Sequence, residues 1–196
     1  MIKTLLVFRH GETDWNAEER FQGHIDIPLN SRGKEQARNL IPLLNTHSVE
    51  AILSSDLSRA FETASLIADE LKVPVFKDSR LRESHLGDAQ GLTRREIEAR
   101  FGAEVVERWR SPHLSDADVS YPGGETGTAV YSRVSEALIH FMESFHYSRF
   151  GVATHGGVIR RLMQNILPPG SPQVPIPNGV LYSLEFDLVI KKFKVK

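Results

Sequence analysis

Two histidine–glycine pairs follow apolar runs of the chain. His10 follows the apolar residues 5–8 with one residue between, and His155 directly follows the predicted strand 150–154. Neutral imidazole is a competent nucleophile near pH 7. Glycine lets the backbone turn sharply and leaves N–H groups facing outward. A buried strand that ends in such a pair is therefore expected to deliver a reactive ring to the edge of a sheet.

Two arginines lie close to the ends of predicted strands. Arg9 precedes His10, and Arg59 lies in the first turn of a predicted helix, after a third apolar run at residues 51–55. A cation at that position opposes the helix dipole, which indicates a functional reason for it. Guanidinium groups suit phosphate oxygens, and a helix that opens at Gly156 favours an anion at its N-terminus. The residue types together predict a site for a tetrahedral dianion.

Composition excludes several other functions. The formal net charge of −1 gives no support to nucleic-acid binding or to an anionic membrane surface. There is no cysteine and no HxH or HxxxH spacing, and the guanidinium of Arg9 repels a cation near His10, so we expect no metal. The N-terminus lacks the long apolar region of a signal peptide, and no stretch approaches the ~20 apolar residues of a membrane span. We expect a cytoplasmic protein.

Strands and helices alternate along most of the chain, which predicts an α/β fold of three layers, αβα, with a mostly parallel central sheet. Ligands of such sheets bind beyond the carboxyl ends of the strands. We expect one domain, 1–196, with a helical or loop insertion at about 80–125 and a helix break or kink at Pro42. The predicted strands are 3–8, 51–55, 73–76, 150–154 and two within 179–194 that turn near Asp187; the predicted helices are 32–44, 56–71, 93–109 (one or two short helices), 126–146 and 157–166.

An ordered set of motifs resembles a known family. The motifs are RHGETDWN, ERFQGHIDIPLNSRGKEQA, LSSDLSRAFETA, LRESHLGDAQGLT, YPGGET, ATHGGVIRRL and PNG at 177–179. In this order they resemble the histidine phosphatase superfamily, which includes phosphoglycerate mutase. The chain is closest in character to the short bacterial broad-specificity or α-ribazole-type phosphatases. The resemblance implies a phosphoglycerate mutase-like fold with the insertion over the active site.

The resemblance also implies a mechanism. His10 would attack phosphorus to form a phosphohistidine, while Arg9, Arg59 and a protonated His155 hold the equatorial oxygens. Glu83 would protonate the leaving group and then take a proton from the hydrolytic water. No metal and no cofactor is required.

Further positions match residues that touch phosphate or substrate in relatives, although each could equally be a turn residue. Glu12 is a rival acid, but it matches a position that orients nearby groups. The candidate binding residues are Asn16, Gln22, Gly23, Gly156 and Asn178.

The same pocket can serve a phosphatase or a mutase. An arginine and a tyrosine with which mutases grip their substrate are absent from residues 83–87, the mutases' paired arginines have no obvious match, and the chain ends soon after its last strand. Fewer cations predict a monophosphate substrate and an open site. We therefore expect a phosphomonoester hydrolase acting on a small phosphorylated metabolite. The alternatives are a cofactor-dependent phosphoglycerate mutase and a phospho-ligand binding module without turnover.

Specificity is expected to lie in the insertion, and the protein could be a monomer or a homodimer. Residues of the insertion that could line the pocket are His85, Arg94, Arg95, Trp109 and Tyr121.

Overall fold

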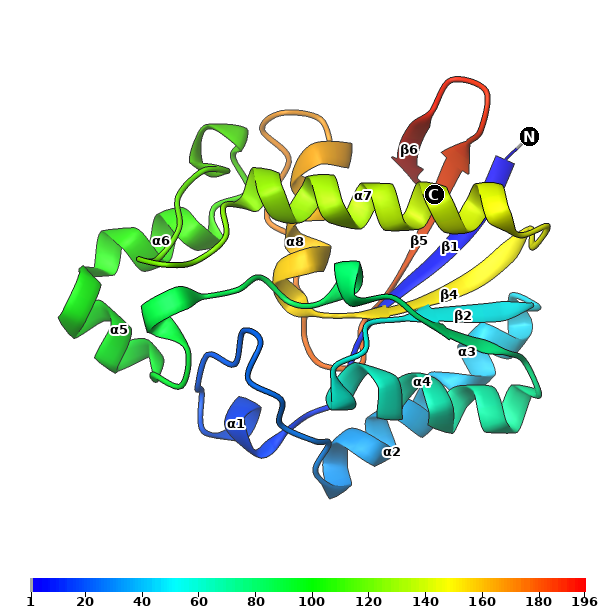
Figure 1. Ribbon diagram of the computed structural model, residues 1–196, viewed down its shortest axis with the longest axis horizontal. Coiled ribbons are helices and arrows are strands. Elements are labelled where there is room, and N and C mark those ends of the chain that lie inside the picture. The colour runs from blue at the N-terminus through cyan, green and yellow to red at the C-terminus, as the bar shows by residue number, and fades with distance from the viewer. Residues whose placement is uncertain (1) are drawn as a thin grey trace.

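A six-stranded mixed sheet forms the centre of the molecule in the computed structural model, which describes residues 2–196 (Figure 1). The strand order is β3-β2-β4-β1-β5-β6. The first four strands of that order run parallel to one another. Strand β5 pairs antiparallel with β1, and β6 pairs antiparallel with β5. The strands are β1 (Ile2–Arg9), β2 (Ala51–Ser54), β3 (Val75–Lys77), β4 (Arg149–Thr154), β5 (Leu181–Asp187) and β6 (Lys192–Val195).

Helices cover both faces of the sheet. One hydrophobic core joins the sheet to α7 and α8, and a second joins it to α3, α4 and Leu40, which follows α2. This arrangement confirms the predicted three-layer α/β fold. The helices are α1 (Asp14–Ala17), α2 (Ser31–Asn39), α3 (Ile41–Thr46), α4 (Ser58–Leu71), α5 (Arg94–Phe101), α6 (Ala103–Arg110), α7 (Gly127–Ser144) and α8 (Gly156–Ile166), with 3₁₀ turns at η1 (Ser79–Leu81), η2 (Gly87–Ala89) and η3 (Leu114–Asp116).

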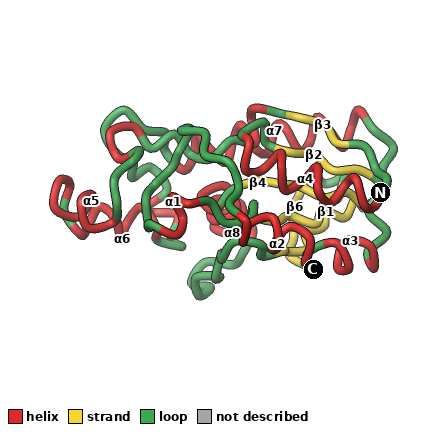
Figure 2. The backbone as a smooth tube through the Cα atoms, turned by 90° about the horizontal axis from the view of Figure 1, so that it is seen from below, coloured by secondary structure: helices red, strands yellow, loops and turns green. Residues whose placement is uncertain are grey.

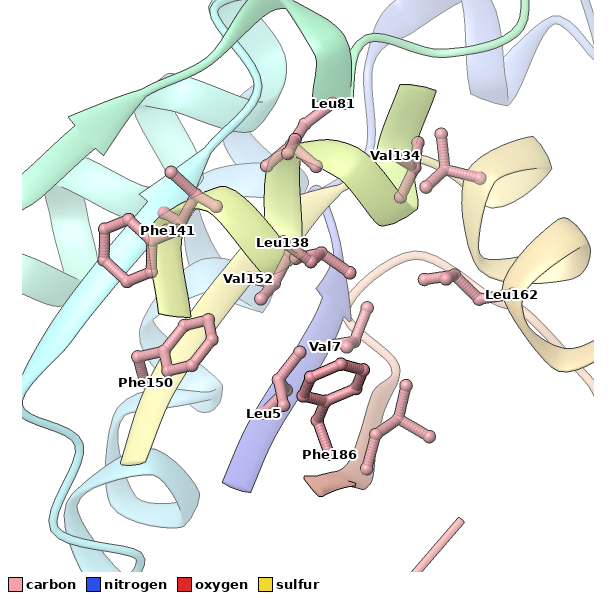
Figure 3. Packing of buried hydrophobic residues seen from close by; sticks show 14 of the residues in the cluster. Leu5, Val7, Leu81, Val134, Leu138, Phe141, Phe150, Val152, Leu162 and Phe186 are labelled. Atoms are coloured by element: carbon pink, nitrogen blue, oxygen red, sulfur yellow. The ribbon is translucent and has the colours of Figure 1, made fainter. Parts of the chain in front are cut away.

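Strand β1 is buried on both of its faces. Leu5 and Val7 face the core below α7 and α8, where they lie near Phe186 in Figure 3, whereas Leu6 and Phe8 belong to the core on the opposite side. A strand between two helical layers has no solvent face, which explains a continuous apolar run rather than an alternating one. The same run carries the chain to Arg9 at the carboxyl edge.

The single helix predicted at 32–44 is instead two helices. Helix α2 ends at Asn39, and α3 begins at Ile41 with Pro42 in its first turn. Proline is tolerated there because the first N–H groups of a helix have no partner within the helix. The break expected at Pro42 therefore falls just before it, at Leu40. The other predicted elements are present, with ends that differ by at most two residues.

The insertion forms a small core of its own. Apolar side chains of η2, α5, α6 and the following loop pack together beside Phe21. Figure 2 shows α5 and α6 at the end of the molecule away from the sheet. Hydrogen bonds between Phe21 and residues 91–92 attach this core to the loop after α1.

Within residues 2–196, no helix has the length and apolar character needed to cross a membrane.

Two glycines fix the loop after β1 against α2. A Cβ atom at Gly33 would lie 2.1 Å from the carbonyl oxygen of Glu12, and one at Gly11 would lie 2.1 Å from the carbonyl oxygen of Gly33. The backbones are thus in direct contact. Neither position has room for a side chain.

Replacement of Gly33 by alanine is expected to lower the free energy of unfolding by about 1–3 kcal/mol, because the added methyl group displaces the loop backbone. Urea denaturation measures this directly. The control is Arg38→Ala, an exposed position on the same helix, which should change the value by less than about 0.5 kcal/mol. Equal stability of the two variants would show that the loop moves aside without cost.

Candidate active site

The carboxyl ends of β1, β2 and β4 lie side by side and gather the predicted residues (Figure 1). His10 follows β1 and lines a cavity of about 600 Å³ together with Arg9, Arg59 and Glu83. His155 follows β4 and is fully buried behind the cavity wall, with its ring centroid 5.2 Å from that of His10. The parallel pairing of β1 with β4 thus brings the two histidine–glycine pairs together.

The His10 ring is oriented by its own backbone. Its Nδ1 lies 2.6 Å from the carbonyl oxygen of Gly11. A carbonyl can only accept, so Nδ1 carries the proton and Nε2 keeps its lone pair. Burial lowers the pKa of His10 well below its usual 6.5, and the charges of Arg59 and Arg9 lower it further. The ring is therefore neutral at pH 7, with a free nitrogen able to attack an electrophile.

The two predicted arginines are held by backbone carbonyls. Arg9 donates to the carbonyl of Ile176 at 2.7 Å, and Arg59 donates to those of Gly23 and Ile25 at 2.8 and 2.9 Å. Burial lowers the pKa of Arg59 to about 10, so it stays charged at pH 7. The Nε of each guanidinium is buried and has no partner within residues 2–196. Both retain donors for a bound anion.

Glu83 lies at the N-terminus of α8. Its carboxylate accepts the backbone N–H of Gly157 at 3.0 Å and that of Ser84 at 2.8 Å. A Cβ atom at position 157 would lie 2.3 Å from this carboxylate, so only glycine leaves room for it. His24 and Arg133 hold the carbonyl of Glu83 from the other side. The carboxylate is thus fixed at the wall of the cavity.

The candidate binding residues divide into two groups. Asn16, Gln22, Gly23 and Gly156 line the cavity. Asn178 lies outside the lining and donates to the carbonyls of His10 and Gly11 and to the side chain of Asn16.

Glu12 lies outside the lining as well. Its carboxylate is engaged by Asn30 and Arg32. This placement agrees with the orienting role expected for Glu12.

The groups around His155 favour its neutral form, whereas the protonated form was expected only with phosphate oxygens beside it. Burial lowers its pKa well below 6.5, and the neighbouring Arg59, His10 and Arg9 act in the same direction. Its Nε2 lies 2.8 Å from Oγ of Ser55, while Nδ1 is buried without a partner among the described residues. His155 is therefore a neutral ring at pH 7.

The cavity also holds arginines that the sequence analysis did not name. Arg110, at the end of α6, and Arg160, on α8, line the cavity in addition to the predicted arginines. Sequence reasoning missed both. The only available signals were that Arg110 follows Trp109 at a helix end and that Arg160 lies one turn beyond the second histidine–glycine pair.

The five insertion residues named from the sequence differ in placement. Arg94 and Trp109 line the cavity, whereas Tyr121 is buried within the insertion core. Arg95 is exposed, and His85 packs edge-on against His24.

The part of the chain that the structure describes contains no group of three or more histidine, aspartate or glutamate side chains suited to a metal ion.

Comparison with known proteins agrees with this geometry. The model of the histidine phosphatase superfamily, branch 1, matches residues 5–192. The chain belongs to the histidine phosphatase superfamily. A curated relative, phosphoglycerate mutase-like protein 4 of Arabidopsis thaliana, is 41% identical over 167 residues, which cover 84% of this chain and 71% of that protein.

Solved structures of phosphatases share the fold. A mycobacterial glucosyl-3-phosphoglycerate phosphatase in complex with VO3 is 30% identical with a TM-score of 0.85, covering 99% of this chain and 96% of that one. The α-ribazole phosphatase of Shigella flexneri is 28% identical with a TM-score of 0.77, covering 98% and 94%. The protein is a phosphomonoesterase of the histidine phosphatase superfamily, as the motifs predicted.

The buried neutral histidines link stability to pH. The unfolded chain takes up protons on these rings near pH 6.5, whereas folded His10 and His155 bind them only at lower pH. The free energy of unfolding should therefore fall as the pH falls from about 7 to about 5, and less steeply in His155→Gln. Urea denaturation across this range measures both slopes. Identical slopes would contradict the depressed pKa of His155.

Proposed function

We propose that the protein hydrolyses phosphomonoesters through a phosphohistidine on His10. The observation that carries this proposal is a neutral imidazole with a free Nε2 beside the buried Arg59 and the half-buried Arg9. Arg9, Arg59 and the N-terminus of α8 at Gly156 bind the phosphate dianion and stabilise the charge of its equatorial oxygens. Phosphoryl transfer depends mainly on such positioning and electrostatics.

The reaction takes two steps. Nε2 of His10 attacks phosphorus, the P–N bond forms, and the bond to the leaving oxygen breaks as Glu83 gives that oxygen a proton. Water then attacks the phosphohistidine while the same carboxylate accepts its proton. The P–N bond breaks and inorganic phosphate leaves. The positive charge comes from arginine side chains, which supports a reaction without a metal ion.

Hydrolysis of p-nitrophenyl phosphate in EDTA should persist in the wild type and disappear in His10→Ala, because that variant lacks the attacking nitrogen. Glu83→Gln should lose at least about 100-fold in kcat on an alkyl phosphate, since general acid catalysis typically contributes that factor. Samples quenched in alkaline denaturant should contain at most a transient phosphoprotein that is stable to alkali and labile to acid. Loss of turnover in EDTA would contradict the metal-free mechanism.

A mutase is the second candidate, favoured by the name of the Arabidopsis relative. A mutase keeps its phosphohistidine from water and returns the phosphoryl group to a substrate. A long-lived phosphohistidine with negligible phosphate release, together with conversion of 3-phosphoglycerate primed by a bisphosphate, would favour it over hydrolysis. No turnover and no phosphohistidine would indicate a binding module.

A second anion on the substrate is proposed from the two additional arginines. Arg160 Nη1 lies 3.4 Å from the carbonyl oxygen of Arg110, and neither residue makes a salt bridge within residues 2–196. Burial and the nearby charges of Arg110 and Arg161 lower the pKa of Arg160 to about 10. An anion between the two guanidinium groups would relieve this repulsion.

The proposed substrate class is a phosphomonoester of a hydroxy acid. Arg110 lines the same cavity as Arg9. Burial lowers the pKa of Arg9 and the charge of Arg110 lowers it further, in agreement with a second charge close to the phosphate site. A phosphorylated hydroxy acid carries its carboxylate a short distance from the phosphate. The substrate in the name of the mycobacterial phosphatase contains such a carboxylate, and this supports the proposal.

Arg160→Gln and Arg110→Gln should each lower the ratio of kcat/KM for 3-phosphoglycerate to that for glycerol 3-phosphate by about tenfold, because a hydrogen bond to a charged group is lost. Arg95→Gln, exposed on α5, is the matched control and should leave this ratio unchanged. Phosphate release measures all three. A ratio that falls equally in the control, or in no variant, would contradict a second anion subsite.

A further inference from the structure

Ser55 contacts the second histidine from the neighbouring strand. It directly follows β2, is fully buried, and donates its backbone N–H to the carbonyl of Ala153 on β4. This parallel pairing places Oγ of Ser55 2.8 Å from Nε2 of His155. Neither the phosphoryl transfer steps nor the binding of a second anion uses this contact.

The direction of this hydrogen bond follows from the other partner of Ser55. Oγ of Ser55 accepts the backbone N–H of Leu57 at 3.3 Å. The hydroxyl has a single hydrogen, and within residues 2–196 the only acceptor that the structure gives it is Nε2 of His155. If Nε2 donated instead, both the hydroxyl hydrogen of Ser55 and the lone pair of Nδ1 would be buried without a partner, whereas donation by Ser55 leaves only the Nδ1–H of His155 unpaired. Ser55 therefore donates, and Nε2 of His155 accepts.

We infer that Ser55 is a positioning residue that holds neutral His155 in its Nδ1–H tautomer, so that this N–H donates a hydrogen bond to the phosphoryl group during transfer. The inference rests on the proposed function. Nδ1 is buried without a partner among the described residues, and the His155 ring lies 5.2 Å from that of the nucleophile. The ring thus supplies a donor without adding a third positive charge beside Arg9 and Arg59.

The two histidines then share a tautomer and perform opposite tasks. In His10 the Nδ1 proton is given to the carbonyl of Gly11, which leaves the lone pair of Nε2 for attack. In His155 the lone pair of Nε2 is occupied by Ser55, which leaves the Nδ1 proton for the phosphoryl oxygens. One ring provides the electron pair and the other provides the hydrogen bond.

The tautomer can be read by NMR spectroscopy of protein labelled with ¹⁵N-histidine, with His155→Gln to assign the signals. At neutral pH the wild type should show Nδ1 of His155 protonated and Nε2 unprotonated. In Ser55→Ala the proton should move toward Nε2, the tautomer that free imidazole side chains prefer. On p-nitrophenyl phosphate, kcat should fall about tenfold and KM should change less, because one hydrogen bond of the transition state is lost.

Ser54→Ala is the matched control. This residue is equally buried at the end of β2, but its hydroxyl donates to the carbonyl of Ser55 and does not contact His155. The control should keep both the wild-type tautomer and a kcat within about twofold of wild type.

Two results would overturn the inference. One is a wild-type His155 that carries its proton on Nε2 or on both nitrogens. The other is an unchanged tautomer in Ser55→Ala. The wild-type spectrum decides the first even if the alanine variant does not fold. The spectra need no turnover, whereas absence of hydrolysis by the wild type would contradict the proposed function alone.

Discussion

Positive charge without a contacting carboxylate is the constraint on which the site depends. Arg9, Arg59, Arg110 and Arg160 line one cavity, and none of them makes a salt bridge among the described residues. Glu83 acts on Arg9 and Arg59 by its charge but accepts backbone N–H groups instead of pairing with them. The repulsion among the guanidinium groups is left for a ligand to offset, which makes the cavity selective for anions.

Backbone carbonyls hold this charge in place. The segments around Gly23 and Ile25 and around Ile176 are far apart in the sequence, yet each accepts hydrogen bonds from an arginine that lines the cavity. Asn178 likewise holds the carbonyls of His10 and Gly11. Neutral acceptors orient an arginine without cancelling its charge, so the loops can shape the site and leave its field intact. The sheet places the histidines, and loop carbonyls orient the guanidinium groups of Arg9 and Arg59.

Local features of the sequence are sufficient to predict the strands and helices of the fold and the residues at the centre of the candidate site. His10, Arg59 and His155 each lie within a few residues of a strand end, and the position of a strand end can be read from an apolar run. Arg110 and Arg160 reach the cavity only because α6 folds back beside α8, and no local pattern predicts that contact.

The charge state of His155 and the role of Asn178 depend on tertiary packing for the same reason. Pro42 predicts a helix break, but the break lies two residues earlier, at Leu40. Proline constrains the residues before it, but the helix can resume with Pro42 in its own first turn.

The parallel pairing of β1 with β4 also affects the kinetics of folding. It joins strands near opposite ends of the chain, and closing so long a loop costs entropy before the contacts compensate for it. The catalytic groups are therefore dispersed in any intermediate that lacks this pairing. The rate at which turnover recovers during refolding therefore reports the rate at which the central sheet closes. Recovery of the circular dichroism signal of the helices does not report it.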